Sequence, residues 1–178
     1  MKLPSKYICI DIETTDAEAS KGDVIQIGAV VLNEDLSMGS EFMTFLKPTS
    51  DYRNLKAMDV NGISEEHLAL SPDPNEALER FEEFCLKYDK RPLLAAWGTY
   101  FDVTFLRQYY KKIGRKWIFS YRCLDLKSIA IWEVSKRDKE TAAGGVHTFL
   151  EILGLKFEGK PHDAIDDIKN TLKIIQNL

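Results

Sequence analysis

The sequence predicts an α/β fold, with a mixed sheet of antiparallel and parallel strands and helices on both of its faces. Two observations predict this class. Three short apolar runs, rich in β-branched residues, follow one another within the first 47 residues and are joined by short linkers. After residue 74, strand-like and helix-like apolar patterns alternate, which is typical of strands joined by helices.

The three N-terminal runs are expected to form an antiparallel meander. The first, residues 7–12, is almost continuously apolar, as expected of a strand buried on both faces, and it ends in a polar loop at residues 13–16. The second and third strands are expected at residues 24–33 and 41–47. The linkers between the three runs are short and contain turn-forming residues, namely Gly22, Asn33 and Gly39.

The remaining elements are expected to be mostly helical. Residues 48–74 are expected to be largely irregular, with one short helix at 64–70. Helical spacing of apolar residues, together with proline and glycine at the boundaries, predicts the later elements. In order, these are a helix at 75–87, a strand at 92–97, helices at 103–113 and 126–134, a polar loop at 136–145, a short helix at 148–153 and a terminal helix at 163–177.

The chain length of 178 residues suits one compact domain spanning residues 1–178. The first residues carry no secretory signal, and every apolar run is too short to cross a bilayer. Three widely spaced cysteines, Cys9, Cys85 and Cys123, argue against disulfides and zinc, and we expect all three to be buried. A soluble cytoplasmic protein without a membrane partner is therefore expected.

Two carboxylates close the first predicted strand. Asp11 and Glu13 are two positions apart on an extended chain, so both side chains leave the same face. They lie at the carboxyl end of an apolar strand, where open α/β sheets place ligand sites. Two adjacent acids repel unless a cation neutralises them. A pair of solvated acids at a strand end is the alternative, and it is the common case for such a pair alone.

Two further segments carry acids near predicted helix starts. Asp102 follows the fourth strand, and a plain helix N-cap is the alternative explanation for it. His162 is expected to begin the terminal helix, and Asp167 follows five residues later. Acids in the first turns of a helix are also common without any function, and this alternative applies to both Asp166 and Asp167.

Taken together, the three segments resemble the motifs of the DnaQ-like (DEDDh) 3′→5′ exonucleases, which have an RNase H-like fold with a five-stranded sheet. The resemblance covers residues 7–170 and rests on Asp11-x-Glu13-Thr14-Thr15, Phe101-Asp102 and His162-x-Ala164-x-x-Asp167. The segment GKPHDAIDDIKN and the pair Trp97-Gly98 are similar to the Eri-type exoribonucleases and sporulation-inhibitor relatives. Polymerase proofreading subunits commonly have His-Asn at that pair, and RNA and DNA both remain candidate substrates.

The resemblance implies a metal-dependent hydrolysis that releases nucleoside 5′-monophosphates from the 3′ end of single-stranded RNA or DNA. Two Mg²⁺ or Mn²⁺ ions would be held by oxygen ligands, with Asp11 bridging them. His162 would be the general base, because an imidazole titrates close to neutral pH. The implied metal ligands are Asp11, Glu13, Asp102 and Asp167, with Asp166 as the alternative to Asp167.

The resemblance also implies substrate contacts. Thr14 and Thr15 would contact the terminal sugar. The segment 60–63 resembles the part of the family that contacts the terminal base, so Asn61 and Ile63 are candidates, with Ile63 as a wedge. Trp97 and Phe101 adjoin the site and could stack on bases, although core packing is the alternative for Phe101.

The charge balance is compatible with this hypothesis. The net charge of −4 comes from 28 acidic and 24 basic residues, and it argues against non-specific duplex binding. Setting aside the four implied metal ligands leaves 24 residues of each sign. The basic run at residues 107–116 is expected to be a solvated helix end, with a backbone-binding patch as the alternative.

Two rival functions fit the sequence less well. A non-catalytic nucleic-acid-binding module on the same fold should lack at least one ligand or the histidine, and here all five positions are filled. A serine hydrolase or phosphatase has no supporting motif. Homodimerisation and association with a polymerase both remain open.

Overall fold

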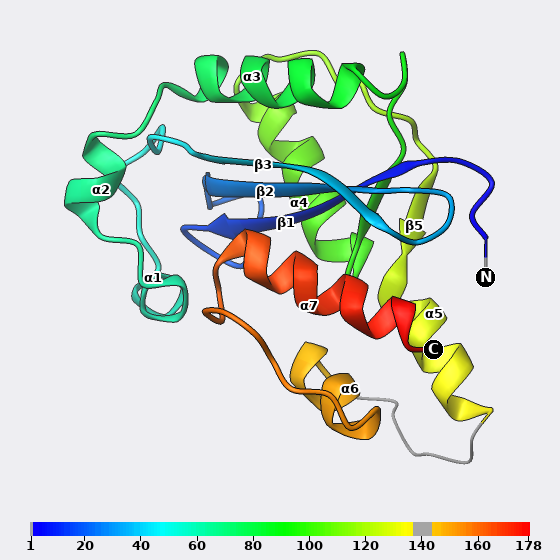
Figure 1. Ribbon diagram of the computed structural model, residues 1–178. Helices are drawn as coiled ribbons and strands as arrows, with labels where there is room; N and C mark the ends of the chain where they lie inside the picture. Colours follow the sequence, from blue (N-terminus) through cyan, green and yellow to red (C-terminus); the bar gives the residue numbers. More distant parts are fainter. Residues whose placement is uncertain (1, 137–143) are drawn as a thin grey trace.

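The computed structural model describes residues 2–136 and 144–178. Five strands form one sheet in the order β3-β2-β1-β4-β5. Strands β1, β2 and β3 are antiparallel neighbours, whereas β4 is parallel to β1 and β5 is parallel to β4. The predicted mixed sheet is confirmed (Figure 1). The strands are β1 (Tyr7–Thr14), β2 (Val24–Leu32), β3 (Met38–Phe45), β4 (Leu94–Ala96) and β5 (Cys123–Asp125).

Three strand predictions need correction. Strand β1 continues through Glu13 and Thr14, which were expected in a loop, because both residues still pair with β2, although a bulge between them shifts the register. The third strand lies earlier than predicted, since it begins at Met38 after a tight turn. The pattern also gave no position for β5, which is only three residues long and begins with the exposed Cys123.

Seven helices are described, and most were predicted. They are α1 (Leu55–Asn61), α2 (Glu65–Ala69), α3 (Pro74–Leu86), α4 (Thr99–Lys112), α5 (Leu126–Ser135), α6 (Val146–Ile152) and α7 (Ala164–Gln176). Helix α1 was missed in a region expected to be irregular; the side chain of Asn54 caps it. The predicted loop at 136–145 falls mostly on residues 137–143, outside the described residues.

Two helix starts also differ from the prediction. Helix α4 begins at Thr99, so Asp102 lies within the first turn and the N-cap position belongs to Gly98. Helix α7 is capped by Asp163, whose side chain accepts hydrogen bonds from the N–H groups of Ile165 and Asp166. His162 therefore precedes the helix instead of beginning it.

Alternate residues of β1 face opposite sides of the sheet. Ile8, Ile10 and Ile12 pack in one core with α3 and α4. Cys9 faces the other core, which α5 and α7 supply. Helices thus cover both faces, as predicted, and α7 crosses the face opposite to α3 (Figure 1). By the period of two, Asp11 and Glu13 share the face of Cys9, toward α7.

The start of α7 lies directly against β2 because Gly28 has no side chain. A Cβ at Gly28 would lie 2.8 Å from the Cβ of Ala164, a distance that real contacts do not reach. The N–H of Ala164 also donates to the side chain of Gln26 at 3.4 Å. This close approach brings the segment before α7 to the carboxyl end of β1.

No helix within the described ranges is long and apolar enough to span a membrane. Cys9 and Cys85 are buried, as expected, but Cys123 is exposed because it begins an edge strand.

Candidate active site

A cavity of about 700 Å³ opens at the carboxyl end of β1. Segments far apart in sequence form its walls: the end of β1, helix α1, the first turn of α4, the start of α6 and the segment around α7. The lining residues include all five predicted catalytic positions, which are Asp11, Glu13, Asp102, His162 and Asp167. The fold therefore brings the three motifs together.

The acids of β1 lie where burial and mutual repulsion disfavour their charge. Burial raises the pKa of Glu13 to about 8, and the nearby charges of Asp167 and Asp102 add to this effect. Burial also raises the pKa of Asp11 well above its usual range, and the neighbouring carboxylates Asp102 and Glu13 contribute further. In the absence of cations, the fold therefore favours the protonated forms of both acids.

Asp102 is tied to the end of β1 by a backbone contact. Its Oδ1 accepts a hydrogen bond from the N–H of Ile12 at 3.2 Å, and its residue exposure is only 6%. Burial raises the pKa of Asp102 to about 7, although backbone hydrogen bonds oppose the shift. The helix turn thus presents a third carboxylate beside Asp11.

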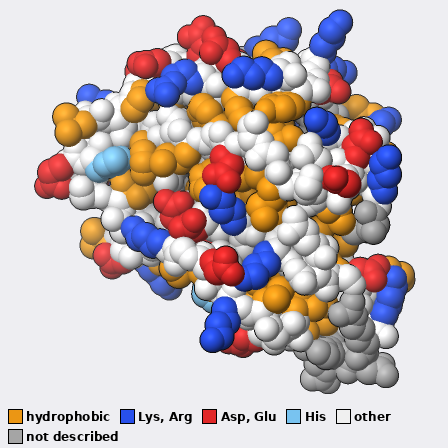
Figure 2. Space-filling view, viewed as in Figure 1, with side chains coloured by type: hydrophobic (Ala, Val, Ile, Leu, Met, Phe, Trp, Pro, Cys, Tyr) orange, Lys and Arg blue, Asp and Glu red, His pale blue; other side chains and the backbone are white. Residues whose placement is uncertain are grey.

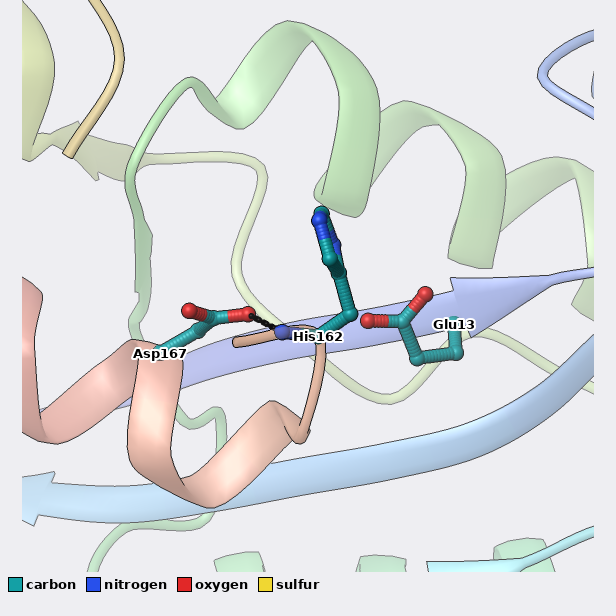
Figure 3. Close-up of side chains that lie close together, drawn as sticks. All are labelled: Glu13, His162 and Asp167. Carbon is teal, nitrogen blue, oxygen red and sulfur yellow. Dashed lines mark hydrogen bonds between the residues drawn. The ribbon is translucent and has the colours of Figure 1, made fainter. Parts of the chain in front are cut away.

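The segment before α7 supplies the histidine and the fourth acid. His162 has φ +61, in the left-handed region that side chains other than glycine seldom adopt. Its N–H donates to Oδ2 of Asp167 at 2.9 Å, as Figure 3 shows. One nitrogen of His162 and one oxygen each of Glu13 and Asp167 lie within 4.8 Å of one another. The local backbone conformation therefore holds the imidazole at the carboxylate cluster.

The structure distinguishes Asp167 from its neighbour. Asp167 lines the cavity, and burial raises its pKa above the usual value. Asp166 is not among the lining residues, and its Oδ2 accepts the N–H of Lys160 at 2.9 Å. A Cβ at Gly159 would overlap the Asp166 carboxylate, so a glycine at this position leaves room for that side chain. The two adjacent acids have different surroundings.

The donor set fits divalent cations with hard, oxygen-preferring coordination. Four carboxylates with raised pKa values converge on one cavity, and within the described part of the chain none of the four forms a salt bridge with a lysine or arginine. Carboxylate oxygens are the ligands that Mg²⁺ and Mn²⁺ favour. No cysteine lines the cavity, which disfavours a thiolate site.

The predicted substrate contacts fall into two groups. Thr14, Trp97 and Phe101 line the cavity, and Phe101 is 38% exposed instead of being absorbed into the core. Thr15, Asn61 and Ile63 are not among the lining residues. Thr15 is fully buried and its hydroxyl accepts the N–H of Asp23, while the side chain of Asn61 joins the carbonyl of Thr14 to the N–H of Ile63.

Several lining residues were missed by the sequence analysis. Lys56 and Ala57 come from α1, the helix that was not predicted, as does Val60, which belongs to the segment 60–63 that the resemblance singled out. His147 comes from the start of α6, where its ring stacks on Phe157 with centroids 4.6 Å apart. An isolated histidine or lysine carries no motif, so the sequence offered no signal for either one.

Two residues of the basic run at 107–116 make ion pairs within the fold. Lys112 makes an ion pair with the buried Asp23 at 2.9 Å, and Arg115 pairs with Glu82 at 2.7 Å. The run lies at the end of α4 opposite to Asp102. On the face in Figure 2, acidic and basic side chains are interspersed without a broad area of one sign. Because two of the five basic residues are paired within the fold, these contacts disfavour a nucleic-acid-binding patch at this helix end.

Comparison with known proteins agrees with this geometry. The model of the RNase T family, described as an exonuclease family, matches residues 8–175. The chain belongs to this exonuclease family. The predicted exonuclease class is confirmed.

Individual relatives are similar over most of this chain. The 3′-5′ DNA exonuclease Cap18 of Escherichia coli is 29% identical over 173 residues, covering 92% of this chain and 86% of Cap18. The PolC-type DNA polymerase III of Thermotoga petrophila is 27% identical over 169 residues, which are 94% of this chain but only 11% of the polymerase. This chain therefore matches a small part of the polymerase and most of Cap18.

A solved structure shows the same fold. The nuclease domain of 3′hExo, a DEDDh family member bound to rAMP, superposes with a TM-score of 0.78 at 20% identity. The match covers 96% of this chain and 90% of that domain.

Proposed function

We propose that this protein removes nucleotides one at a time from the 3′ end of single-stranded RNA or DNA and releases nucleoside 5′-monophosphates. The observation that carries the proposal is the convergence of Glu13, His162 and Asp167 within 4.8 Å, on the wall of a cavity that Asp11 and Asp102 also line. A non-catalytic binding module has no need for an imidazole beside four unneutralised acids.

Two divalent cations, Mg²⁺ or Mn²⁺, would supply charge relief on the transition state and activation of the attacking water. Asp11, Glu13, Asp102 and Asp167 would hold them, with Asp11 between the two positions. Because burial and repulsion raise the pKa values of these acids, cation binding must release protons. The fixed carboxylates of the strand and the helix turn set where the phosphate must lie.

His162 would accept the proton from the attacking water. Two features hold its backbone: the left-handed φ and the hydrogen bond from its N–H to Asp167. The imidazole is exposed on the cavity wall, so a water molecule and a phosphate can reach it. A general base must lie within hydrogen-bond reach of the proton that it removes, and this position allows that.

The cavity walls suit a splayed 3′ end. Phe101, Val60 and Trp97 offer apolar and aromatic surface on which bases can stack without sequence preference. Lys56, His147 and Thr14 offer donors toward phosphate and sugar oxygens. We propose that Thr15 and Asn61 act indirectly, by fixing the backbone at Thr14, and that Val60 takes the wedge role expected of Ile63.

The test uses 5′-labelled single-stranded RNA and DNA of one sequence, incubated with Mg²⁺, Mn²⁺ or a chelator. We expect a ladder that shortens from the 3′ end, with nucleoside 5′-monophosphates as products, and no reaction in chelator. Internal cleavage, or full activity in chelator, would contradict the proposal. Comparing the two nucleic acids decides the sugar preference.

The two adjacent acids of α7 provide a matched pair of variants. Asp167→Asn should lower turnover by about 10²-fold or more, the order expected when a group that stabilises transition-state charge is lost. Asp166→Asn changes the same charge one residue away, and its remaining carbonyl oxygen can still accept the N–H of Lys160. It should retain turnover within about twofold. Equal losses in both variants would mean that α7 contributes only structure.

A further inference from the structure

Helix α4, which carries Asp102, has no capping side chain of its own. Its N-cap position is Gly98, with φ +108, and no side chain of the cap residue bonds to the first turn. The first N–H groups of a helix lack intrahelical partners and need others. The start of the helix that holds a metal ligand therefore depends on a residue elsewhere in the chain.

That residue is Asp125, at the end of β5. Its Oδ2 accepts the N–H of Thr99 at 2.8 Å and the hydroxyl of Thr99 at 3.1 Å. Its other oxygen, Oδ1, accepts the N–H of Ser128 at 2.7 Å and caps α5. One carboxylate thus caps two helices, with one oxygen for each.

The sheet register explains how this is achieved. Asp125 is the partner of Ala96 in the parallel pairing of β5 with β4. The chain leaves β4 after Ala96 and reaches Thr99 three residues later, so the start of α4 lies beside the end of β5. Figure 1 shows β5 running directly into α5, so the same carboxylate also stands at the start of that helix.

We propose that Asp125 is a positioning residue that fixes Asp102 for metal binding. Asp102 lies one helical turn after Thr99, and its Oδ1 is held by the N–H of Ile12 at 3.2 Å. The first turn of α4 is thus fixed at one point by β1 and at another by β5. Without the second contact, the turn can rotate or fray, and Asp102 moves relative to Asp11. This inference rests on the proposed function, because it assigns Asp102 as a ligand.

Asp125→Ser separates the two roles of Asp125. Serine is a good N-cap, so the variant keeps a cap for α5. A single short hydroxyl cannot also reach Thr99, so α4 loses its cap. The matched control is Asp73→Ala, which removes the N-cap of α3, a helix without any cavity-lining residue. Thr99→Val is a milder second variant, since it removes only the hydroxyl donor to Asp125.

The experiment measures Mn²⁺ affinity by calorimetry without substrate, amide hydrogen exchange over residues 99–102, and Tm. We expect Asp125→Ser to weaken Mn²⁺ binding about 10-fold, the lower end of the range for residues that support metal ligands. Exchange at residues 99–102 should be faster, and Thr99→Val should show smaller shifts of both kinds. Asp73→Ala should lower Tm and leave Mn²⁺ affinity unchanged.

The outcomes separate this inference from the proposed function. Wild-type Mn²⁺ affinity and unchanged exchange in Asp125→Ser would overturn the positioning role while leaving the nuclease proposal intact. If the two Asp variants weakened Mn²⁺ binding equally, the effect would be general loss of stability and the inference would also fail. If the wild-type protein bound no Mn²⁺, the proposed function would be overturned, and the positioning role with it. Hydrogen exchange would then measure only how Asp125 caps α4.

Discussion

Two buried aspartates of this protein have opposite surroundings. Asp23 is fully buried, and its carboxylate accepts hydrogen bonds from Thr49 and Ser50 and pairs with Lys112 at 2.9 Å. Burial opposes its charge, but these partners outweigh the burial and lower its pKa. Asp102 is nearly as buried, at 6% exposure, but has no cation beside it among the described residues, and burial raises its pKa to about 7.

The comparison distinguishes a carboxylate that stabilises the fold, Asp23, from one whose charge the surrounding groups do not balance, Asp102. A buried acid is stable when internal donors replace the water that it loses. Asp23 has those donors. Asp102, Asp11 and Glu13 instead line one cavity, where burial raises their pKa values and the neighbouring carboxylates add to the shifts of Asp11 and Glu13. We expect cations from solution to neutralise the carboxylates of the cavity and to have no role at Asp23.

The largest expected effect is at Asp102. Asp102→Asn should lower exonuclease turnover by about 10³-fold. The loss of a metal ligand removes several kcal/mol of transition-state stabilisation, and each 1.4 kcal/mol lowers the rate about tenfold. The same change should raise the Tm of the cation-free protein at pH 8, since it removes a buried charge without a partner. Single-turnover assays and thermal melts test the two halves.

Asp23→Asn is the matched control in the other region. It should lower Tm, because Lys112 and the donors of Thr49 and Ser50 lose a charged acceptor. Its turnover at 25 °C should stay within about threefold of the wild type, because Asp23 is not among the residues that line the cavity. If both variants changed Tm in the same direction, the contrast between the regions would be wrong.

The next largest effect is at the histidine. His162→Ala should lower turnover by about 10²–10⁴-fold, the range for loss of a general base, and leave Mn²⁺ affinity largely intact. His67→Ala is the control, since His67 packs on the ring of Phe45 and lies outside the cavity. Normal turnover in His162→Ala would mean that another group accepts the proton.

A smaller effect is expected at the ion pair of Asp23. Lys112→Met should destabilise the protein by about 1–3 kcal/mol, less than a fully buried pair because the lysine side chain is 32% exposed. Its exposed neighbour provides the control: Lys111→Met should change stability by less than about 0.5 kcal/mol. Denaturant titrations of both variants measure the difference. Equal values would show that Asp23 does not need its cation.

The last prediction concerns the pH dependence of the cation-free protein. The pKa of Glu13 rises from 4.5 in the unfolded chain to about 8 in the fold, so the folded state binds more protons between these values. Stability should therefore fall as pH rises from about 4.5 to 8. Mn²⁺ should restore stability at the high end.

Tm measured from pH 5 to 8.5, with and without Mn²⁺, checks this profile. Glu13→Gln should flatten the decline. A cation-free protein whose stability rises steadily across this range would contradict the raised pKa values of the site.

Much of the fold could be predicted because it follows from local patterns. The apolar runs of β1 and β2 and the helical spacing of α3 and α7 are strong enough to fix their elements. Helix α1 was missed because it is one short amphipathic piece capped by Asn54, and β5 because three residues at an edge show no periodicity. These two short elements carry Lys56 and Asp125, so the missed structure lies close to the site.

The site residues likewise divide into those that a sequence pattern predicts and those that it does not. The motif spacing was enough to select Asp11, Glu13, Asp102, His162 and Asp167, and all five line one cavity. The substrate contacts were less predictable, because a side chain's direction depends on neighbours distant in sequence. Thr14 faces the cavity while Thr15, the next residue, is fully buried against Asp23.

The sequence by itself determined the order of the longer strands and helices along the chain, the chemical kind of each motif and the family to which the chain belongs. Only the tertiary structure decided that Thr14 and not Thr15 faces the cavity, that Lys112 pairs with Asp23 within the fold, and that Asp125 caps the helix of Asp102. The physical reason is that a local pattern fixes the backbone conformation of a segment. The partners of a polar side chain depend instead on close approaches such as that of Ala164 to Gly28, which join residues more than a hundred positions apart.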